Sequence, residues 1–209
     1  MKGIFIVVEG IDGSGKGYMM MRLQEYITGR SKKYDHVLLT REPTNSNIGQ
    51  KMREILVKES DPTTGARKCL DLYVSDRKQH LENHILPALE KGYVVLCDRY
   101  KYSTMAFQAA QGLPLEELIE LQKDFRTPDL TLILDLPTRQ AIARIRYRDW
   151  QGSNEKFEDP TFMEKVRMNY LTIAHQLKDP IEIINAGVEK VEMFNQVKAA
   201  IEKRGILPY

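Results

Sequence analysis

Residues 4–16 read Ile-Phe-Ile-Val-Val-Glu-Gly-Ile-Asp-Gly-Ser-Gly-Lys, and this stretch decides how the chain is organised. Its first half is apolar and rich in β-branched residues, which is typical of a strand covered on both faces. The glycines that follow break the strand, and a helical pattern opens after Lys16. The segment therefore predicts a strand, a tight loop and a helix in direct succession.

The spacing of Gly10, Gly15 and Lys16 is G-x-x-x-x-G-K, a phosphate-binding P-loop in its required strand–loop–helix setting. Glycines let backbone N–H groups turn toward phosphate oxygens, and the helix N-terminus adds partial positive charge. Lys16 supplies a charge that can follow a transferring phosphoryl group. The alternative is a glycine-rich turn without a ligand, and the matching setting favours binding. The nucleotide-binding residues predicted here are Gly10, Asp12, Gly13, Ser14, Gly15, Lys16, Gly17 and Tyr18.

Positions 17 and 18 depart from the usual loop. The Ser or Thr whose hydroxyl commonly holds Mg²⁺ is replaced by Gly17, and Tyr18 follows. Mg²⁺ keeps several waters and binds mostly to substrate phosphates, so its site can survive without that ligand. We expect nucleotide binding to be kept and metal affinity or rate to be reduced.

The rest of the chain has an α/β pattern. Apolar runs resembling the first occur at 36–39, 93–97, 130–134 and 181–184, and helical patterns separate them. Strands that alternate with helices predict an open parallel sheet with helices on both faces. Three helical segments have a predicted buried stripe. The stripes are Leu70, Tyr73, Val74, Arg77, Leu81, His84, Ile85, Ala88 and Leu89; Phe162, Val166, Tyr170, Ile173 and Leu177; and Val188, Val191, Phe194, Val197 and Ile201. The second of these helices is predicted to start at Asp159-Pro160.

Composition narrows the class of protein. The 209 residues suit one domain spanning 1–209, and 42% apolar with 29% charged residues is typical of a globular chain. A net charge of +2 is too near neutral to imply a general nucleic-acid-binding surface. No apolar run reaches the roughly 18 residues that span a bilayer, so no membrane partner is expected. Cys69 and Cys97 lie in apolar stretches and are expected to be core residues, which suits a reducing cytoplasm.

A second anion site is indicated at Asp98-Arg99-Tyr100, which follows the third apolar run. Open α/β sheets bind ligands at the carboxyl ends of their strands. There, Asp98 can hold magnesium or its water, and Arg99 can bind a phosphate with two parallel N–H groups. The alternative is an Asp–Arg pair that only stabilises the loop.

With these residues in place, the chain resembles the thymidylate kinase family over nearly its whole length. The resemblance implies a three-layer α/β/α fold like that of P-loop nucleoside monophosphate kinases, with a five-stranded parallel sheet and a short lid. The segments that carry it, specific by their order and spacing, are Glu9-Gly10-Ile11-Asp12 with the P-loop, Thr40-Arg41-Glu42-Pro43, Leu72-Tyr73 with Arg77, Asp98-Arg99-Tyr100 with Ser103-Thr104 and Phe107-Gln108, the arginines near 146, and Asn185-Ala186.

The resemblance implies roles for individual residues. Asp12 would bind the deoxyribose 3′-hydroxyl and, together with Asp98, organise Mg²⁺. Arg99 and Arg53 would bind the acceptor phosphate, and Tyr73 stands where a family phenylalanine stacks on thymine. Phe107 stands where bacterial members often carry a tyrosine against the sugar. The implied acceptor-site residues are Asp12, Glu42, Pro43, Arg53, Tyr73, Arg77, Arg99, Ser103, Thr104, Phe107 and Gln108.

The pair Tyr73 and Arg77 is also informative without the resemblance. The two residues are four apart and share a helix face, and Arg77 lies inside an apolar stripe. A buried guanidinium needs an acceptor because an unpaired charge is costly there. A nucleobase carbonyl below a stacked ring would supply one. The alternative is an internal salt bridge with Asp71, Asp76 or a carboxylate elsewhere, with Tyr73 as a plain core residue.

Arginines crowd the stretch before Gly152, and the polar segment from Trp150 to Lys156 has the composition of a mobile loop. On a continuous helix, Arg144 and Arg148 share a face while Arg146 points away. A charge run is often a solvated face, but arginines that close over a transferring phosphoryl group also stabilise its charge.

Some members of the family that this chain resembles carry the catalytic arginine in the P-loop, at the position of Gly13 here. Others carry it in the lid. The resemblance therefore implies the lid type, with a lid at 146–158 and Arg146 and Arg148 as candidates. Which basic residue is catalytic stays open. Arg144, Asn185 and Ala186 would contact the adenine of ATP.

The resulting hypothesis is a cytoplasmic, homodimeric kinase that transfers phosphate from ATP, with Mg²⁺, to dTMP. The proposed catalytic residues are Lys16, Asp12, Asp98, Arg99, Arg146 and Arg148. Two alternatives remain at this point. One is a kinase for another deoxynucleoside monophosphate, and the other is a nucleotide-binding protein with impaired catalysis because of Gly17 and Tyr18.

Overall fold

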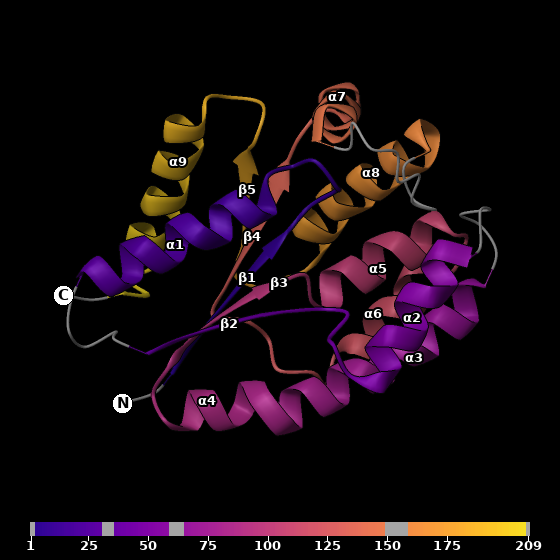
Figure 1. Ribbon diagram of the computed structural model, residues 1–209, viewed down its shortest axis with the longest axis horizontal. Helices are drawn as coiled ribbons and strands as arrows, with labels where there is room; N and C mark the ends of the chain where they lie inside the picture. Colours follow the sequence, from indigo (N-terminus) through magenta and orange to yellow (C-terminus); the bar gives the residue numbers. More distant parts are fainter. Residues whose placement is uncertain (1–2, 31–35, 59–64, 149–158, 208–209) are drawn as a thin grey trace.

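The computed structural model describes residues 3–30, 36–58, 65–148 and 159–207. Within these ranges the chain forms one parallel sheet with strand order β2-β3-β1-β4-β5 (Figure 1). The strands are β1 (Ile4–Glu9), β2 (Val37–Arg41), β3 (Val94–Asp98), β4 (Leu130–Asp135) and β5 (Ile181–Asn185). The α/β class and the five predicted strands are confirmed.

Every observed strand runs one or two residues beyond its predicted carboxyl end. The added residues are polar and still pair in the ladder: Val8 pairs with Asp98, Asp98 with Arg41, and Asp135 with Asn185. Apolar runs alone miss these residues because their side chains are polar, although their backbones stay in the sheet. These strand ends bring Asp98 and Arg41 to one edge of the sheet.

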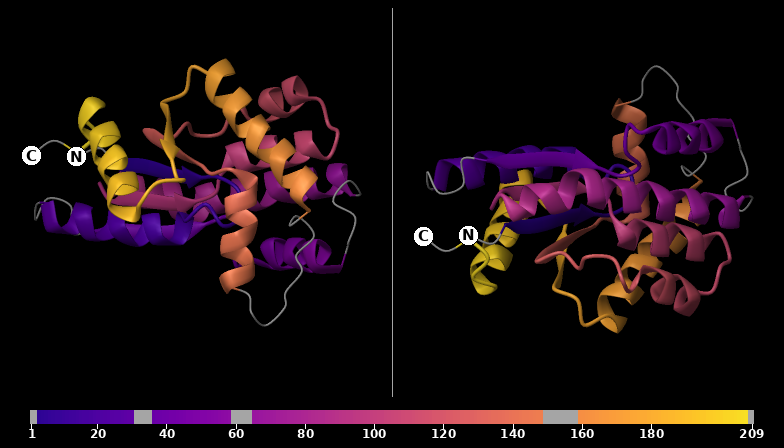
Figure 2. Two further views of the ribbon diagram at one scale, coloured as in Figure 1. Left: turned by 90° about the horizontal axis from the view of Figure 1, so that it is seen from above. Right: turned by 90° about the horizontal axis from the view of Figure 1, so that it is seen from below.

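Helices connect the strands and cover both faces of the sheet (Figures 1 and 2). Successive side chains of β1 pack into two different hydrophobic cores. Ile6 and Val8 pack in the cluster that includes α1, whereas Phe5 and Val7 pack against η2 and α4. The helices are α1 (Lys16–Arg30), α2 (Asn47–Lys58), α3 (Ala66–His80), the π-helical turn η2 (Leu81–Ile85), α4 (Leu86–Glu90), α5 (Lys101–Ala110), α6 (Leu115–Gln122), α7 (Thr138–Arg148), α8 (Pro160–Gln176) and α9 (Lys190–Lys203).

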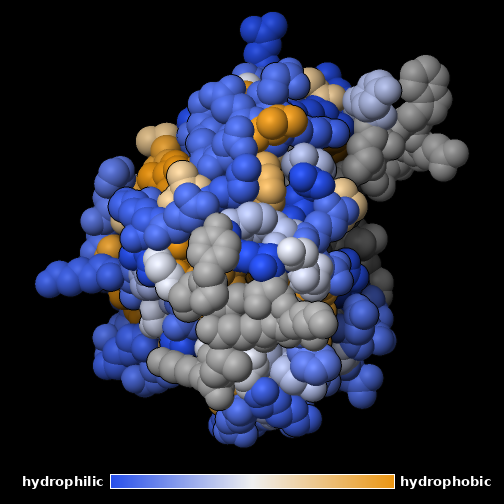
Figure 3. Space-filling view, turned by 90° about the vertical axis from the view of Figure 1, so that its left-hand side faces the viewer, coloured by the Kyte–Doolittle hydropathy of each residue, from blue (hydrophilic) through white to orange (hydrophobic). Residues whose placement is uncertain are grey.

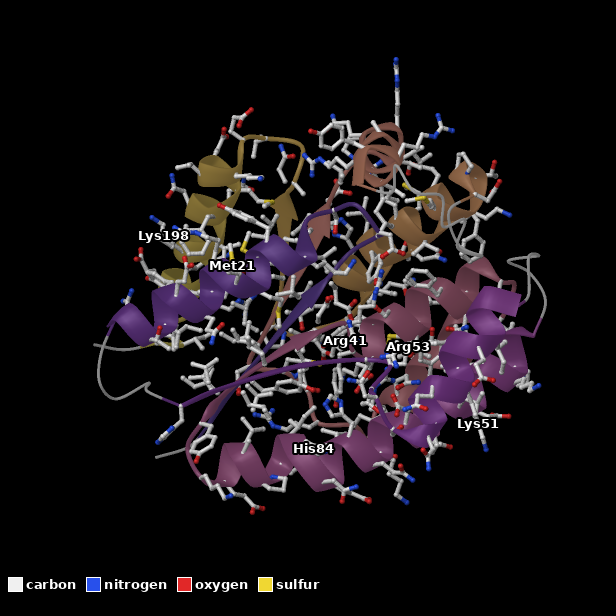
Figure 4. All side chains as sticks on the ribbon, in the orientation of Figure 1. Met21, Arg41, Lys51, Arg53, His84 and Lys198 are labelled. Carbon is white, nitrogen blue, oxygen red and sulfur yellow. The ribbon has the colours of Figure 1, made fainter. Side chains whose placement is uncertain are left out.

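The predicted helical stripes are largely confirmed, with two corrections. His84 is exposed, because it lies in η2, where the wider π-turn rotates the residues relative to a regular α-helical period (Figure 4). Val191 is 72% exposed, because α9 begins at Lys190 and turns Met193 inward instead. The predicted start of α8 is confirmed, since the Asp159 carboxylate accepts a hydrogen bond from the N–H of Phe162.

Cys69 and Cys97 are both buried and free, as predicted. Among the described residues, no helix has the length and apolar character needed to cross a membrane. Polar side chains dominate the face drawn in Figure 3, where hydrophobic atoms occur in small separate groups.

Candidate active site

The P-loop joins β1 to α1 at the carboxyl edge of the sheet. Three of its glycines have left-handed backbones, with φ of 137° at Gly10, 78° at Gly13 and 98° at Gly15. A Cβ atom at Gly13 would lie 2.6 Å from the carbonyl oxygen of Ala141 in α7. Glycine is therefore required at position 13 both by the backbone and by the close approach of α7.

Lys16 is folded back into the loop. Its Nζ donates to the carbonyls of Gly10 at 3.1 Å and Ile11 at 3.2 Å, and lies 3.6 Å from Oδ1 of Asp12. Burial lowers the pKa of the Lys16 ammonium and the charge of Arg99 lowers it further, while Asp12 raises it. Carbonyl oxygens are weak partners for an ammonium compared with phosphate oxygens, so this charge is ready to exchange partners.

The structure shows the surroundings of Gly17 and Tyr18, the two positions that depart from the usual P-loop. Gly17 is exposed, and a Cβ atom there would meet nothing within 4 Å. Tyr18 packs against the core, and Nζ of Lys190 lies 5.2 Å from the centre of its ring. Of the loop hydroxyls, that of Ser14 is buried and has no hydrogen-bond partner in the described part of the chain.

Arg99 occupies the predicted place beside the P-loop. It is a non-glycine residue with φ of 67°, a strained conformation that surrounding contacts must maintain. Its Nη2 donates to Asp12 at 2.8 Å, and its guanidinium lies 5.0 Å above the ring centre of Phe107. Burial opposes the charge of Arg99, but Asp12 and other nearby oxygens outweigh it and raise the pKa. The hydrogen-bonded pair therefore forms with Asp12, not with Asp98.

Asp98 instead presents an unused acceptor. Its Oδ1 is buried and has no hydrogen-bond partner among the described residues. A buried carboxylate oxygen without a partner is costly unless an ion or water satisfies it. A pocket of about 730 Å³ lies beside it, and its lining includes Gly17, Met20, Arg41 and Asp98. Asp98 thus fits a hydrated Mg²⁺, even though Gly17 adds no ligand.

Glu9 is a buried residue of this site to which sequence reasoning assigned no role. Its carboxylate accepts from the N–H groups of Tyr100 and Ser103, and from the hydroxyls of Ser103 and Tyr170. Burial raises the pKa of Glu9, whereas the hydrogen bond from Ser103 and the charge of Arg99 lower it. Only its place in the Glu-Gly-Ile-Asp segment signalled it, because its partners lie more than 90 positions away.

Arg77 is fully buried and held by other parts of the chain. Glu42 accepts from Nε at 2.8 Å and lies 2.7 Å from Nη2, Gln122 accepts from Nη1 at 2.5 Å, and Thr104 accepts from Nη2 at 2.9 Å. The internal salt bridge weighed as an alternative is therefore present, and its carboxylate is Glu42 rather than Asp71 or Asp76. Gln122 carried no sequence signal, since a lone glutamine on a helix has many uses.

The other predicted acceptor residues surround Arg77 and Arg99. Burial raises the pKa of the Tyr73 phenol, and the charges of Arg99 and Arg77 oppose that shift. Phe107 is almost buried beneath Arg99. Gln108 donates to Gln111 at 2.6 Å, while its Oε1 has no partner among the described residues. Ser103 and Thr104 lie in the first turn of α5.

The segment after β2 brings Pro43 and Arg53 together. Nη2 of Arg53 donates to the carbonyl of Pro43 at 2.6 Å. Partial burial and the neighbouring charge of Arg41 lower the pKa of Arg53, and Figure 4 shows these two arginines close together. Two neighbouring guanidiniums, one at the end of β2 and one in α2, favour an anion between or beside them. Arg41 lies in the Thr40-Arg41-Glu42-Pro43 segment, but the sequence alone predicts no role for it.

The residues predicted to bind the adenine of ATP lie in α7, at the end of β5 and in the loop after it. Nη2 of Arg144 donates to the carbonyl of Ala186 at 3.0 Å, and the side chain of Asn185 accepts from the N–H of Gly187. α7 stays helical through Arg148, and Arg146 is exposed on it. Residues 149–158 of the predicted lid lie outside the described residues.

Comparisons with known proteins agree with this geometry. Residues 8–197 match the family profile described as Thymidylate kinase. The chain is 40% identical to a protein named "Probable thymidylate kinase" from Pyrococcus abyssi, over 97% of each chain. It is 35% identical to the Thymidylate kinase of Bacillus cereus strain Q1, over 98% of this chain and 99% of that one. The chain belongs to the thymidylate kinase family.

Proposed function

We propose that this kinase transfers the γ-phosphoryl group of ATP to a phosphate oxygen of dTMP and forms dTDP and ADP. The observation that carries the proposal is the meeting of Lys16 and Arg99 on one carboxylate. Nζ of Lys16 lies 3.6 Å and Nη2 of Arg99 2.8 Å from the same Oδ1 of Asp12. Two cations that share one anion are well placed to hold two adjacent phosphates.

ATP binds with its phosphates in the loop from Gly10 to Tyr18. Backbone N–H groups and the start of α1 hold the phosphates, and Lys16 exchanges its carbonyl partners for phosphate oxygens. The hydrogen bond from Arg144 to Ala186 supports the placement of adenine beside Arg144, Asn185 and Ala186.

The acceptor binds on the other side of Asp12. Arg99 and Arg53 bind its phosphate, Asp12 takes the 3′-hydroxyl, and Phe107 lies against the sugar. The base stacks on Tyr73 above Arg77. The residues that complete the acceptor site are Glu42, Pro43, Ser103, Thr104 and Gln108. The unused Oε1 of Gln108 supports a polar contact with the base, since a buried acceptor favours a donor from the ligand.

Mg²⁺ would be held by Asp98, with Asp12 nearby, and would neutralise charge on the phosphates of ATP. The acceptor oxygen attacks the γ-phosphorus, and the bond from that phosphorus to the β,γ-bridging oxygen breaks. A phosphate oxygen is already a nucleophile, so no general base is needed. Lys16, Arg99 and the lid arginines Arg146 and Arg148 stabilise the charge that spreads over the transferring group.

The test is an acceptor panel. Purified protein is incubated with ATP, Mg²⁺ and each deoxynucleoside monophosphate in turn, and ADP is measured. dTMP should give the highest kcat/KM, and Lys16→Met should abolish turnover of every acceptor. ADP formation with dTMP no faster than with ATP alone would disprove the proposal.

We also propose that the protein acts as a cytoplasmic homodimer, with residues 146–158 as the lid of a single domain. Two buried free thiols suit a reducing compartment. Sedimentation equilibrium should give twice the chain mass at micromolar concentration, and a monomer at that concentration would contradict the assembly.

A further inference from the structure

The guanidinium of Arg99 is held from behind by two hydroxyl groups. Its Nη1 donates to Oγ of Ser103 at 3.1 Å and to the phenol oxygen of Tyr170 at 3.2 Å. With Asp12 on Nη2, three of its five N–H groups are engaged. The remaining two, on Nε and Nη2, have no partner among the described residues.

Tyr170 reaches this position from α8, which lies beside α5 in Figure 1. The side chain is 1% exposed, so its phenol cannot be satisfied by bulk water. Its oxygen lies 2.9 Å from Oε2 of Glu9 and 2.8 Å from Oγ of Ser103. Because the carboxylate of Glu9 accepts from both hydroxyls, their oxygen lone pairs are free to accept from Arg99.

We propose that Tyr170 is a positioning residue for phosphoryl transfer: its phenol, oriented by Glu9, fixes the guanidinium of Arg99 so that the free N–H groups face the acceptor phosphate. This inference rests on the proposed function of Arg99. Without the phenol, Nη1 loses one acceptor and the strained residue at φ 67° loses one of the contacts that fix its side chain.

The chain offers a matched control in Tyr102. That residue is also fully buried, and its phenol donates to the carboxylate of Asp179 at 2.6 Å, away from Arg99. Tyr170→Phe and Tyr102→Phe therefore each remove one buried hydroxyl bonded to a carboxylate. A merely structural role predicts similar losses of stability and similar kinetics for the two variants.

The experiment measures kcat and KM for both substrates, and the dissociation constant of dTMP by calorimetry. Tyr170→Phe should weaken dTMP binding about ten-fold, the usual worth of a hydrogen bond to a charged group, and leave the KM for ATP unchanged. Tyr102→Phe should leave both unchanged. In an Arg99→Lys background, Tyr170→Phe should have no further effect, because the phenol acts through Arg99.

The outcomes separate the two ideas. If wild-type protein does not phosphorylate dTMP, the proposed function is wrong and this inference goes with it. If wild-type protein is active but the two phenylalanine variants bind dTMP equally well, only the role of Tyr170 is wrong. An additive loss in the Arg99→Lys background would also overturn it, by showing that Tyr170 acts independently of Arg99.

Discussion

At the scale of single residues, Gly17 is the clearest departure from what a P-loop usually contains. Its position is open, so a side chain can be added without a clash. The pocket beside it also reaches Asp98, whose buried Oδ1 lacks a partner among the described residues. A hydroxyl at position 17 would therefore point into the region where we place the metal.

Gly17→Thr should lower the Mg²⁺ concentration that gives half-maximal rate. One added ligand worth about 1 kcal/mol corresponds to roughly five-fold in affinity. The measurement is the initial rate with dTMP across an Mg²⁺ titration at fixed ATP. Gly29→Thr is the control, because Gly29 also lies in α1 and also meets nothing within 4 Å. The same shift in both variants would show that the change comes from helix stability instead.

Individual site residues could be predicted from the sequence where a short local motif is typical of a known chemical role. The P-loop spacing located Lys16, and Asp98-Arg99 was recognised by its place after a strand. Glu9 and Gln122 received no assigned role, because their importance depends on partners far apart in the chain: Glu9 with Tyr170, and Gln122 with Arg77. No local pattern encodes such pairings.

At the scale of elements, Arg77 joins four parts of the fold. It lies on α3, its carboxylate partner Glu42 follows β2, Thr104 lies in α5, and Gln122 ends α6. Oε1 of Glu42 also lies 3.1 Å from Nδ1 of His80, whose Nε2 lies 2.7 Å from the hydroxyl of Thr40. Glu42 is only 5% exposed, so its buried carboxylate depends on these hydrogen-bond donors.

Arg77→Met should therefore lower the free energy of unfolding by about 3–5 kcal/mol, because it leaves Glu42 buried without its main cation. It should also raise the KM for dTMP. Arg67→Met is the comparison: Arg67 lies on the same helix but pairs with Glu117 at the surface, and its loss should leave stability unchanged. Urea unfolding measures both variants. Equal stability of the two would show that the Arg77 network contributes little.

Elements were predicted more accurately than their ends. The apolar runs located all five strands, but stopped before Glu9, Arg41, Asp98, Asp135 and Asn185. The strand ends carry the polar residues that form the site, so hydrophobic patterning is least informative where function lies. The π-turn that exposes His84 was also missed, because a five-residue change of helical period is too short to show in the hydrophobic pattern.

At the scale of the whole molecule, the central strand β1 places a buried acid beneath the site. Burial raises the pKa of Glu9 above its ordinary value of 4.5, so the folded state holds that proton more tightly than the unfolded state. The stabilisation that comes from this proton is fully present below the unfolded pKa. It is lost as pH rises through the folded pKa.

The prediction compares wild type with Glu9→Gln, which cannot titrate. The free energy of unfolding of wild type relative to this variant should be largest below about pH 4.5 and should decline as pH rises. Chemical denaturation across the pH range measures the difference. A difference that is flat with pH would show that the hydrogen bonds to Glu9 cancel the effect of burial on its pKa.

The close approach of α7 to the P-loop has a consequence for how this kinase can change. An arginine moved into position 13 would need the space that the carbonyl of Ala141 fills, 2.6 Å from a Cβ there. Its backbone would also have to keep a φ of 78°, which side chains disfavour. Moving the proposed catalytic arginine from the lid to the P-loop is thus a two-site change. Position 13 and the first turns of α7 must vary together, in evolution and in any transplant between the two arrangements.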